Sequence, residues 1–239
     1  MVATLLFALV GCSPPAGQIA ATKEKPPAPL EPSRKDGLKT RVIRPHFPKP
    51  AFVSYPFFCD LPNYDKDRLA HHEQKEFTAP ETTELISIHR PVTSSQPPSH
   101  GTLSLLTNDD DDDENEVEFA GNPVWIQLDL QQPYDIDEIW IWHGQGTKSR
   151  RLTPEVYLDM VVQISSDSEF KEKVTTVFNA DINNRLGFGA GKDPTYWESG
   201  RGRGISVGGQ RARYIRVWGQ GAYSDGPNRF TAVRVWGRK

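Results

Sequence analysis

The chain of 239 residues has an ordinary soluble composition, with 25% charged and 36% hydrophobic residues and a formal net charge of -3 at pH 7. This composition excludes a collagen-like, wholly disordered or multi-span membrane protein. It also argues against a dedicated nucleic-acid-binding protein, for which a strongly basic domain is expected. The two cysteines, Cys12 and Cys59, are too few for a disulfide framework or, alone, for a four-ligand zinc site.

The first twelve residues predict an export signal. Residues 2–10 are almost wholly apolar, are too few to cross a bilayer as a helix, and are followed by Gly11 and Cys12. The run 9–12 (LVGC) resembles the lipobox of bacterial lipoproteins, which implies a lipid on Cys12 and an anchor in the outer membrane or at the cell surface of the bacterial envelope. The alternative is a short, buried apolar N-terminus.

The N-terminal third of the chain is expected to stay largely outside the core. Fifteen of the twenty prolines precede residue 99, whereas all six tryptophans lie at or beyond Trp125. Residues 13–50, rich in proline and small residues, are predicted to form a disordered, extended tether. Residues 51–82 contain several aromatic side chains and are predicted to form an irregular strap across the domain. The folded domain is therefore expected over residues 83–239.

From residue 83 onward, short runs rich in Ile, Val, Trp and Tyr are separated by Gly, Pro, Asn and Asp, which is typical of an all-β domain. In one run, Ile126, Leu128 and Leu130 share one face, so the sheet is expected to bury one side. Two such sheets, stacked, make a sandwich. The predicted strands cover residues 85–89, 125–130, 136–143, 156–165, 174–178, 204–207, 213–218 and 230–236.

Five segments occur in the order and spacing of a known family: residues 92–95 (VTSS), 125–130 (WIQLDL), 136–142 (IDEIWIW), 211–218 (RARYIRVW) and 230–237 (FTAVRVWG). Together they resemble the discoidin domain, also called the coagulation factor five/eight C-terminal domain. The resemblance covers about residues 83–239 and implies a galactose-binding-like jelly-roll β-sandwich. It further implies a non-catalytic module that binds sugars, glycans, phospholipid headgroups or proteins through loops at one end.

A sugar site needs an aromatic face and fixed polar groups for the sugar hydroxyls. Loops between strands can gather such groups, and the loops at residues 143–154, 181–204 and 219–229 contain them. The candidate ligand-binding residues are His143, Trp197, Tyr223, Asn228 and Arg229. Two alternatives stay open: Trp197 caps the end of the sandwich, and His143 is a satisfied hydrogen-bonding residue.

The other tryptophans are interpreted as packing on the faces of the sheets rather than as ligand contacts. They alternate along predicted strands, where arginines can stack on them. The residues concerned are Trp140, Trp142, Trp218 and Trp236, with Arg216 and Arg234 as the stacking partners.

The resemblance also implies a structural calcium ion near the first long loop. Asn108 and Asp109 stand where the family has an Asp-Gly pair, whereas Ala232 stands where the last strand has a glutamate. Residues 109–118 contain eight acidic residues, so Asn108, Asp109 and Asp111 are the candidate ligands for Ca²⁺. The alternatives are a solvated, self-repelling loop and charge pairing with residues 201–239, which hold nine Lys or Arg and one acid.

No motif supports an enzyme. Residues 204–208 have the spacing G-x-S-x-G, but a nucleophile elbow needs a helix after it, and a strand is predicted there. Residues 187–192 approach a phosphate-binding loop, but Leu186 and Asp193 occupy positions that require Gly and Ser or Thr.

The sequence therefore predicts an exported, lipid-anchored, non-catalytic module that binds carbohydrate or glycan. The alternative is a structural or adaptor protein that docks a protein partner at the cell surface or in the periplasm. No cofactor beyond Ca²⁺ and no nucleic acid is expected, and the membrane is expected to be reached through the lipid anchor alone.

Overall fold

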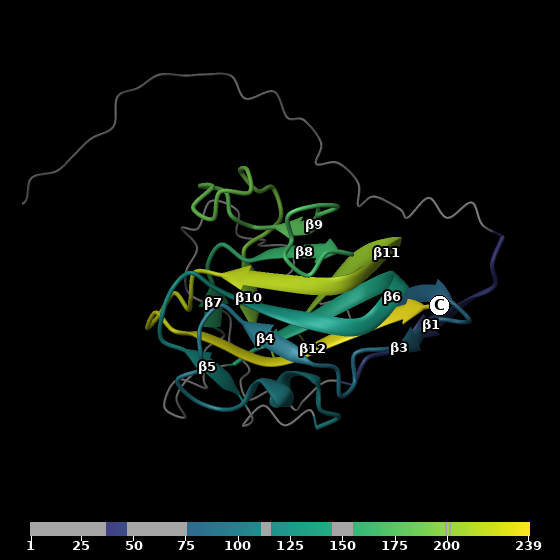
Figure 1. Cartoon of the computed structure of the whole chain (residues 1–239), viewed down its shortest axis with the longest axis horizontal. Helices are drawn as coiled ribbons and strands as arrows, with labels where there is room; N and C mark the ends of the chain where they lie inside the picture. The colour runs from purple at the N-terminus through teal and green to yellow at the C-terminus, as the bar shows by residue number, and fades with distance from the viewer. Residues whose placement is uncertain (1–36, 47–75, 111–115, 145–154, 199, 201) are drawn as a thin grey trace, which may run out of the picture. The chain divides into compact units, whose positions relative to one another are not determined.

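Strands make up almost all the regular structure of the residues that the computed structural model describes, which are 37–46, 76–110, 116–144, 155–198, 200 and 202–239 (Figure 1). These residues belong to one compact unit, Arg34–Lys239. The elements are β1 (Thr40–Ile43), β2 (Phe77–Pro80), β3 (Glu84–Leu85), β4 (Val92–Ser94), the 3-10 helix η1 (Leu103–Thr107), β5 (Val117–Phe119), β6 (Val124–His143), β7 (Glu155–Tyr157), β8 (Val161–Ser165), β9 (Thr175–Asn179), β10 (Tyr196–Glu198), β11 (Arg203–Gly219) and β12 (Asn228–Arg238). The predicted signal peptide with Cys12 lies outside the described residues, as do most of the tether and the strap.

Two long strands, β6 and β11, form the centre of an antiparallel sheet in the order β3-β12-β6-β11-β8-β9, with β4 also beside β6 and β5 beside β12. Each central strand contributes to two layers. Residues 124–129 of β6 pair with 214–219 of β11, next to β4 and β8, whereas residues 134–141 pair with 203–212, next to β12. The bends lie at Gln131 and at Gly208 and Gly209, which have positive φ angles.

The apolar core lies between the two layers. Ile126, Leu128 and Leu130 are 2%, 3% and 0% exposed, so the face predicted for this strand is confirmed. They pack in one cluster with inward-facing residues of the other layer, such as Val233 and Val235 of β12. Alternate side chains of each strand therefore meet between the sheets, as a sandwich requires.

The outer face of the β6–β12 layer carries a second apolar cluster. Its members are Trp140, Trp142, Ala232 and Trp236 on the sheet, and Phe77, Ala79 and Ile43 on β1 and β2. The rings of Phe77 and Trp236 meet edge to face with centroids 5.3 Å apart. β1 belongs to the segment expected to be a disordered tether, and β2 to the expected strap. The folded unit therefore begins before residue 83, because three tryptophans on one sheet face need a cover.

The interpretation of these tryptophans as packing residues is confirmed. On the outer face of the other layer, the guanidinium of Arg216 lies 4.4 Å from the ring centre of Trp125 and 5.9 Å from that of Trp218. Arg234 donates a hydrogen bond to the main-chain oxygen of Leu106 (3.2 Å), and its stacking on tryptophan stays a prediction.

Two predicted strands are shorter than expected. Residues 156–165 are divided into β7 and β8 because Asp159, between them, has a φ of 53°. Of the predicted strand 85–89, only Leu85 lies in a strand, at the end of β3. The backbone turns at His89, which has a φ of 55°. No helix among the described residues is long and apolar enough to cross a membrane.

We expect Phe77→Ala to lower the free energy of unfolding by about 3 kcal/mol, because it removes a buried ring from the cluster on Trp236. Urea unfolding followed by tryptophan fluorescence measures this change. Val42→Ala in β1, where the side chain is 47% exposed, is the control and should change stability by less than about 0.5 kcal/mol. Equal, small effects of both substitutions would show that β1 and β2 do not belong to the cooperative unit.

Candidate functional site

Loops gather at one end of the sandwich, here called the loop end. It contains β5, β7, β10 and the connection from β11 to β12. Isolated bridges join His100 to Glu118 and Tyr157 to Ala222, and β12 begins beside β5. Segments far apart in the sequence therefore share this end of the molecule.

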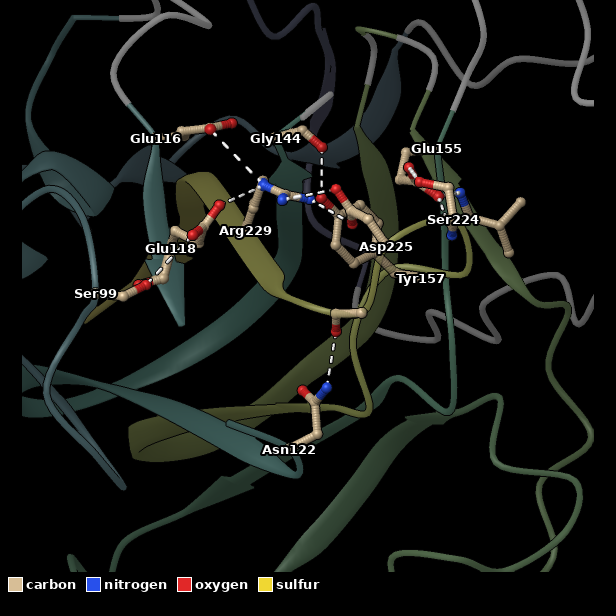
Figure 2. Close-up of polar contacts among 12 residues, drawn as sticks. Ser99, Glu116, Glu118, Asn122, Gly144, Glu155, Tyr157, Ser224, Asp225 and Arg229 are labelled. Carbon is tan, nitrogen blue, oxygen red and sulfur yellow. Dashed lines mark hydrogen bonds and ion pairs between the residues drawn. The ribbon is translucent and has the colours of Figure 1, made fainter. Parts of the chain in front are cut away.

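A buried arginine lies at the centre of the loop end (Figure 2). The guanidinium of Arg229 donates to both carboxylate oxygens of Asp225 (3.0 and 2.9 Å) and to Glu118 (2.8 Å). Glu116 lies 3.8 Å away. The Arg229 side chain is 4% exposed, whereas those of Asp225, Glu116 and Glu118 are 18%, 20% and 28% exposed. Burial by itself lowers the pKa of Arg229, but its bonds to Asp225 and the nearby negative charges raise the pKa overall.

Gly144 lets the end of β6 approach this cluster. Its N–H donates to the main-chain oxygen of Arg229 (3.1 Å), and its own oxygen accepts a bond from the hydroxyl of Tyr157 (2.5 Å). A Cβ atom at this position would lie 2.9 Å from the Cβ atom of Arg229 and would also meet the Glu116 carboxylate. Glycine therefore lets β6 pack closely against Arg229.

His143 lies beside the cluster inside an aromatic cage. Its ring centre is 4.1, 4.4 and 4.6 Å from those of Tyr157, Tyr196 and Phe230, and the residue is 3% exposed. Neither ring nitrogen has a hydrogen-bond partner among the described residues. Burial lowers the pKa of His143 to about 3, so the ring is neutral.

Glu198, which the sequence did not single out, joins β6 to β10. Its carboxylate accepts hydrogen bonds from the hydroxyl of Tyr196 and from the N–H groups of His143 (2.7 Å), Gly200 (2.7 Å) and Gly202 (3.2 Å). Burial raises the pKa of Glu198, and these four bonds offset part of that effect. No sequence motif marks this residue, since its donors are mostly main-chain groups.

The structure brings the five predicted ligand-binding residues to the loop end but buries four of them. His143, Trp197, Asn228 and Arg229 are 3% exposed or less. Asn228 fixes the β11–β12 connection, because its amide accepts a bond from the N–H of Gly221 (3.0 Å) and donates to the oxygens of Asn122 (2.6 Å) and Gly219 (3.3 Å). These four residues hold the loops in position, and their side chains are not on the surface.

Tyr223 is the exposed member of the set, at 48%. Its N–H donates to the oxygen of Val156 (2.8 Å), so the exposed ring stands on a fixed backbone. The next residue, Ser224, donates through its hydroxyl to Glu155. The candidate site therefore consists of the Tyr223 ring and the exposed edges of Asp225, Glu116 and Glu118.

The candidate calcium ligands are only partly placed. Asn108 and Asp109 follow η1, and Asp111 lies outside the described residues. In the orientation that satisfies its amide, Asn108 donates to the main-chain oxygens of Leu105 (2.8 Å) and Asp110 (2.9 Å). Within the described part of the chain, no three His, Cys, Asp or Glu side chains are arranged to hold a metal ion. Calcium binding stays a prediction.

The G-x-S-x-G segment is not a nucleophile elbow. Ser206 lies inside β11, which continues to Gly219, so no strand-to-helix turn presents its hydroxyl.

No family model and no curated protein sequence matches the chain. Solved structures do. A family 89 glycoside hydrolase from Clostridium perfringens, in complex with its substrate GlcNAc-alpha-1,4-galactose, matches 65% of this chain at 17% identity and a TM-score of 0.50. The match covers 15% of that protein, so this chain corresponds to a small part of it.

Two smaller structures match along almost their whole length. A fucose-binding module of Streptococcus pneumoniae has 14% identity and a TM-score of 0.47, with 65% of this chain and 99% of the module covered. CBM32 of AlyQ, in complex with 4,5-unsaturated mannuronic acid, has 17% identity and a TM-score of 0.46, with 64% and 97% covered. The chain has the discoidin-like, galactose-binding-like fold. The match at a TM-score of 0.50, together with the two layers described above, confirms the jelly-roll β-sandwich predicted from the sequence, and at 17% identity this likeness shows the fold alone.

We expect the stability of His143→Phe relative to the natural protein to rise as the pH falls. The unfolded chain protonates His143 near its ordinary pKa of 6.5, whereas the folded protein resists protonation down to about pH 3. Stability is therefore lost as the pH drops below 6.5, by about 2 kcal/mol at about pH 5. Phenylalanine keeps the ring in the cage and removes this loss.

Urea unfolding at about pH 8 and about pH 5 measures the difference between the two proteins. The raised pKa of Glu198 has the opposite effect on stability but is common to both, so it cancels. A stability difference between His143→Phe and the natural protein that stays constant with pH would contradict the burial of a neutral imidazole.

Proposed function

We propose that this protein is a non-catalytic carbohydrate-binding module whose ligand lies at the loop end, on Tyr223 and the carboxylates around Arg229. The observation that carries the proposal is Tyr223, which is 48% exposed and stands two residues before Asp225, whose carboxylate is already held by Arg229. Such a ring contacts the C–H face of a sugar, and ionised carboxylates accept strong hydrogen bonds from its hydroxyls.

Rigid placement supports this function. Both oxygens of Asp225 contact Arg229, so this carboxylate is held in place before a ligand arrives. Because the polar groups are ordered before the ligand arrives, little entropy is lost in ordering them on binding.

The fold is compatible with the proposal but does not locate the site. Proteins of this fold include structures solved with GlcNAc-alpha-1,4-galactose and with 4,5-unsaturated mannuronic acid. The identities are 17% or lower for the structures described above, so the argument for this chain rests on its own loop-end residues.

The proposal includes export and a lipid anchor on Cys12. One small module binds sugar weakly, and many copies on one surface gain avidity without any new contact. We expect the mass of the detergent-extracted native protein to correspond to a chain that begins at a lipid-modified Cys12. A Cys12→Ser variant, as the control, should lack the lipid. An unmodified natural chain that still contains Met1 would contradict the anchor.

We expect Tyr223→Ala to weaken sugar binding at least tenfold while leaving the thermal midpoint of the free protein unchanged, because the ring is exposed. A panel of mono- and oligosaccharides, tested by thermal shift with and without a calcium chelator, identifies the sugar. Isothermal titration with that sugar then measures the loss. Phe188→Ala, which removes a 37% exposed ring that packs on Trp218, is the matched control.

If the natural protein and Tyr223→Ala bind the sugar equally well, the placement of the sugar site at the loop end is contradicted. If no sugar shifts the midpoint at concentrations well above millimolar, the carbohydrate function is contradicted. The adaptor function, with a protein partner, would then take its place.

A further inference from the structure

The tip of the β11–β12 connection, residues 223–225, carries two of the exposed groups of the candidate site. The ring of Tyr223 and the carboxylate of Asp225 stand on either side of Ser224 in the chain. At the base of the connection, the N–H of Gly226 donates to the oxygen of Ala222 (3.0 Å). This bond closes the base, whereas the tip is held by contacts with other strands.

Glu155 of β7 holds Ser224 (Figure 2). Its carboxylate accepts hydrogen bonds from the N–H of Ser224 (3.2 Å) and from the Ser224 hydroxyl. A third bond comes from the N–H of its neighbour Val156 (3.1 Å). Glu155 is 5% exposed, and burying a carboxylate is costly unless donors replace the lost water. The buried carboxylate and the serine of the tip therefore stabilise each other.

β7 is a fixed support for this contact. All three of its residues are buried, and it pairs with β10, where Glu155 lies opposite Glu198. Glu198 in turn accepts a hydrogen bond from the N–H of His143 at the end of β6 (2.7 Å). The contact with Ser224 thus connects the tip to the central strand β6 through two short, buried strands.

The other side of the tip is held from β12. Both oxygens of Asp225 contact the buried guanidinium of Arg229 (3.0 and 2.9 Å). In Figure 2, Arg229 lies on one side of Asp225, and Glu155 with Ser224 lies on the other. Two strands therefore hold the tip, and Ser224 links the residue that carries the ring to the residue that carries the acceptor.

We propose that Glu155 is a positioning residue: through Ser224, it sets the distance between the exposed tyrosine ring and the Asp225 carboxylate. That distance determines which sugar the loop end accepts. The inference rests on the function proposed above. A sugar stacked on the ring presents its hydroxyls at fixed places, and an epimer presents one of them elsewhere. A fixed acceptor rejects the epimer, whereas a mobile acceptor follows the hydroxyl and binds both sugars.

Three variants and a control test this role. Ser224→Ala removes the hydroxyl that Glu155 accepts, and Ser224→Thr keeps one. Ser224 is exposed, so both variants leave the core intact. Glu155→Gln changes the acceptor itself. The matched control is Ser165→Ala, which removes a hydroxyl that fixes the turn after β8 by donating to the oxygen of Glu172 (3.0 Å).

The first measurement needs no sugar. NMR relaxation of the free, full-length protein gives the backbone order parameters of residues 223–225. We expect values of about 0.85 in the natural protein and in Ser224→Thr, and a fall toward about 0.6 in Ser224→Ala and Glu155→Gln. Ser165→Ala should leave the values of these three residues unchanged.

The second measurement is isothermal titration with the methyl glycosides of glucose, galactose and mannose. Galactose and mannose each differ from glucose in the orientation of one hydroxyl. We expect the natural protein and Ser224→Thr to bind one of the three at least about tenfold more tightly than an epimer. In Ser224→Ala this ratio should fall below about threefold. Ser165→Ala should keep the natural ratio even where its thermal midpoint falls, which separates positioning from stability.

Unchanged order parameters in both Ser224→Ala and Glu155→Gln would overturn the proposal. It is also overturned if Ser224→Ala keeps the natural ratio of affinities, if Ser224→Thr loses it, or if the natural protein binds the three sugars alike. In each of these cases sugar binding by the natural protein, and with it the proposed function, is unaffected. If the natural protein binds none of the three, the proposed function is contradicted instead, and a fall in the order parameters would still show that Glu155 positions the tip.

Discussion

The buried guanidinium of Arg229 is the interaction on which the loop end depends. A buried charge needs partners, and Arg229 obtains them from two separate segments, Glu118 on β5 and Asp225 in the β11–β12 connection. In turn, the arginine allows the carboxylates of Asp225, Glu116 and Glu118 to lie close together, which their mutual repulsion would otherwise oppose. The exposed surface of the loop end is therefore set by a residue that is itself almost inaccessible.

One strand connects this cluster to the rest of the molecule. β12 carries Arg229 at its start, Val233 and Val235 toward the core, and Trp236 toward the outer face. The outward tryptophan, together with two on β6, creates an apolar surface outside the sandwich. β1 and β2 cover it, which ties part of the N-terminal segment into the folded unit. The boundary of the domain is thus determined by which sheet face needs cover rather than by the proline content of the chain.

The sequence predicted the sandwich because long strands that alternate between apolar and polar residues, such as residues 125–130, carry a period of two. It did not predict β1, β2, β4, β5 or β10, which have three or four residues each. Three or four residues are too few to show an alternation of apolar and polar side chains. Which strand they pair with depends on tertiary contacts. At the site, residue type located the loop end through His143, Asn228 and Arg229 but could not show that these side chains are buried. No sequence pattern indicated Glu198, because the groups that donate hydrogen bonds to it are mostly main-chain N–H groups.

At the loop end, buried residues hold the loops in place, whereas the candidate site is exposed. This arrangement affects how a ligand would bind. The loops are held by hydrogen bonds within the protein, made by Asn228, Arg229 and Glu198. A ligand at the candidate site therefore meets groups that are ordered and already paired. Such a site gains specificity from geometry, because a hydroxyl in the wrong place finds no acceptor. It gains little affinity, because the described residues of the candidate site expose one aromatic ring and the edges of three carboxylates. Tight attachment to a glycan surface would then depend on several contacts made at once by many copies of the module.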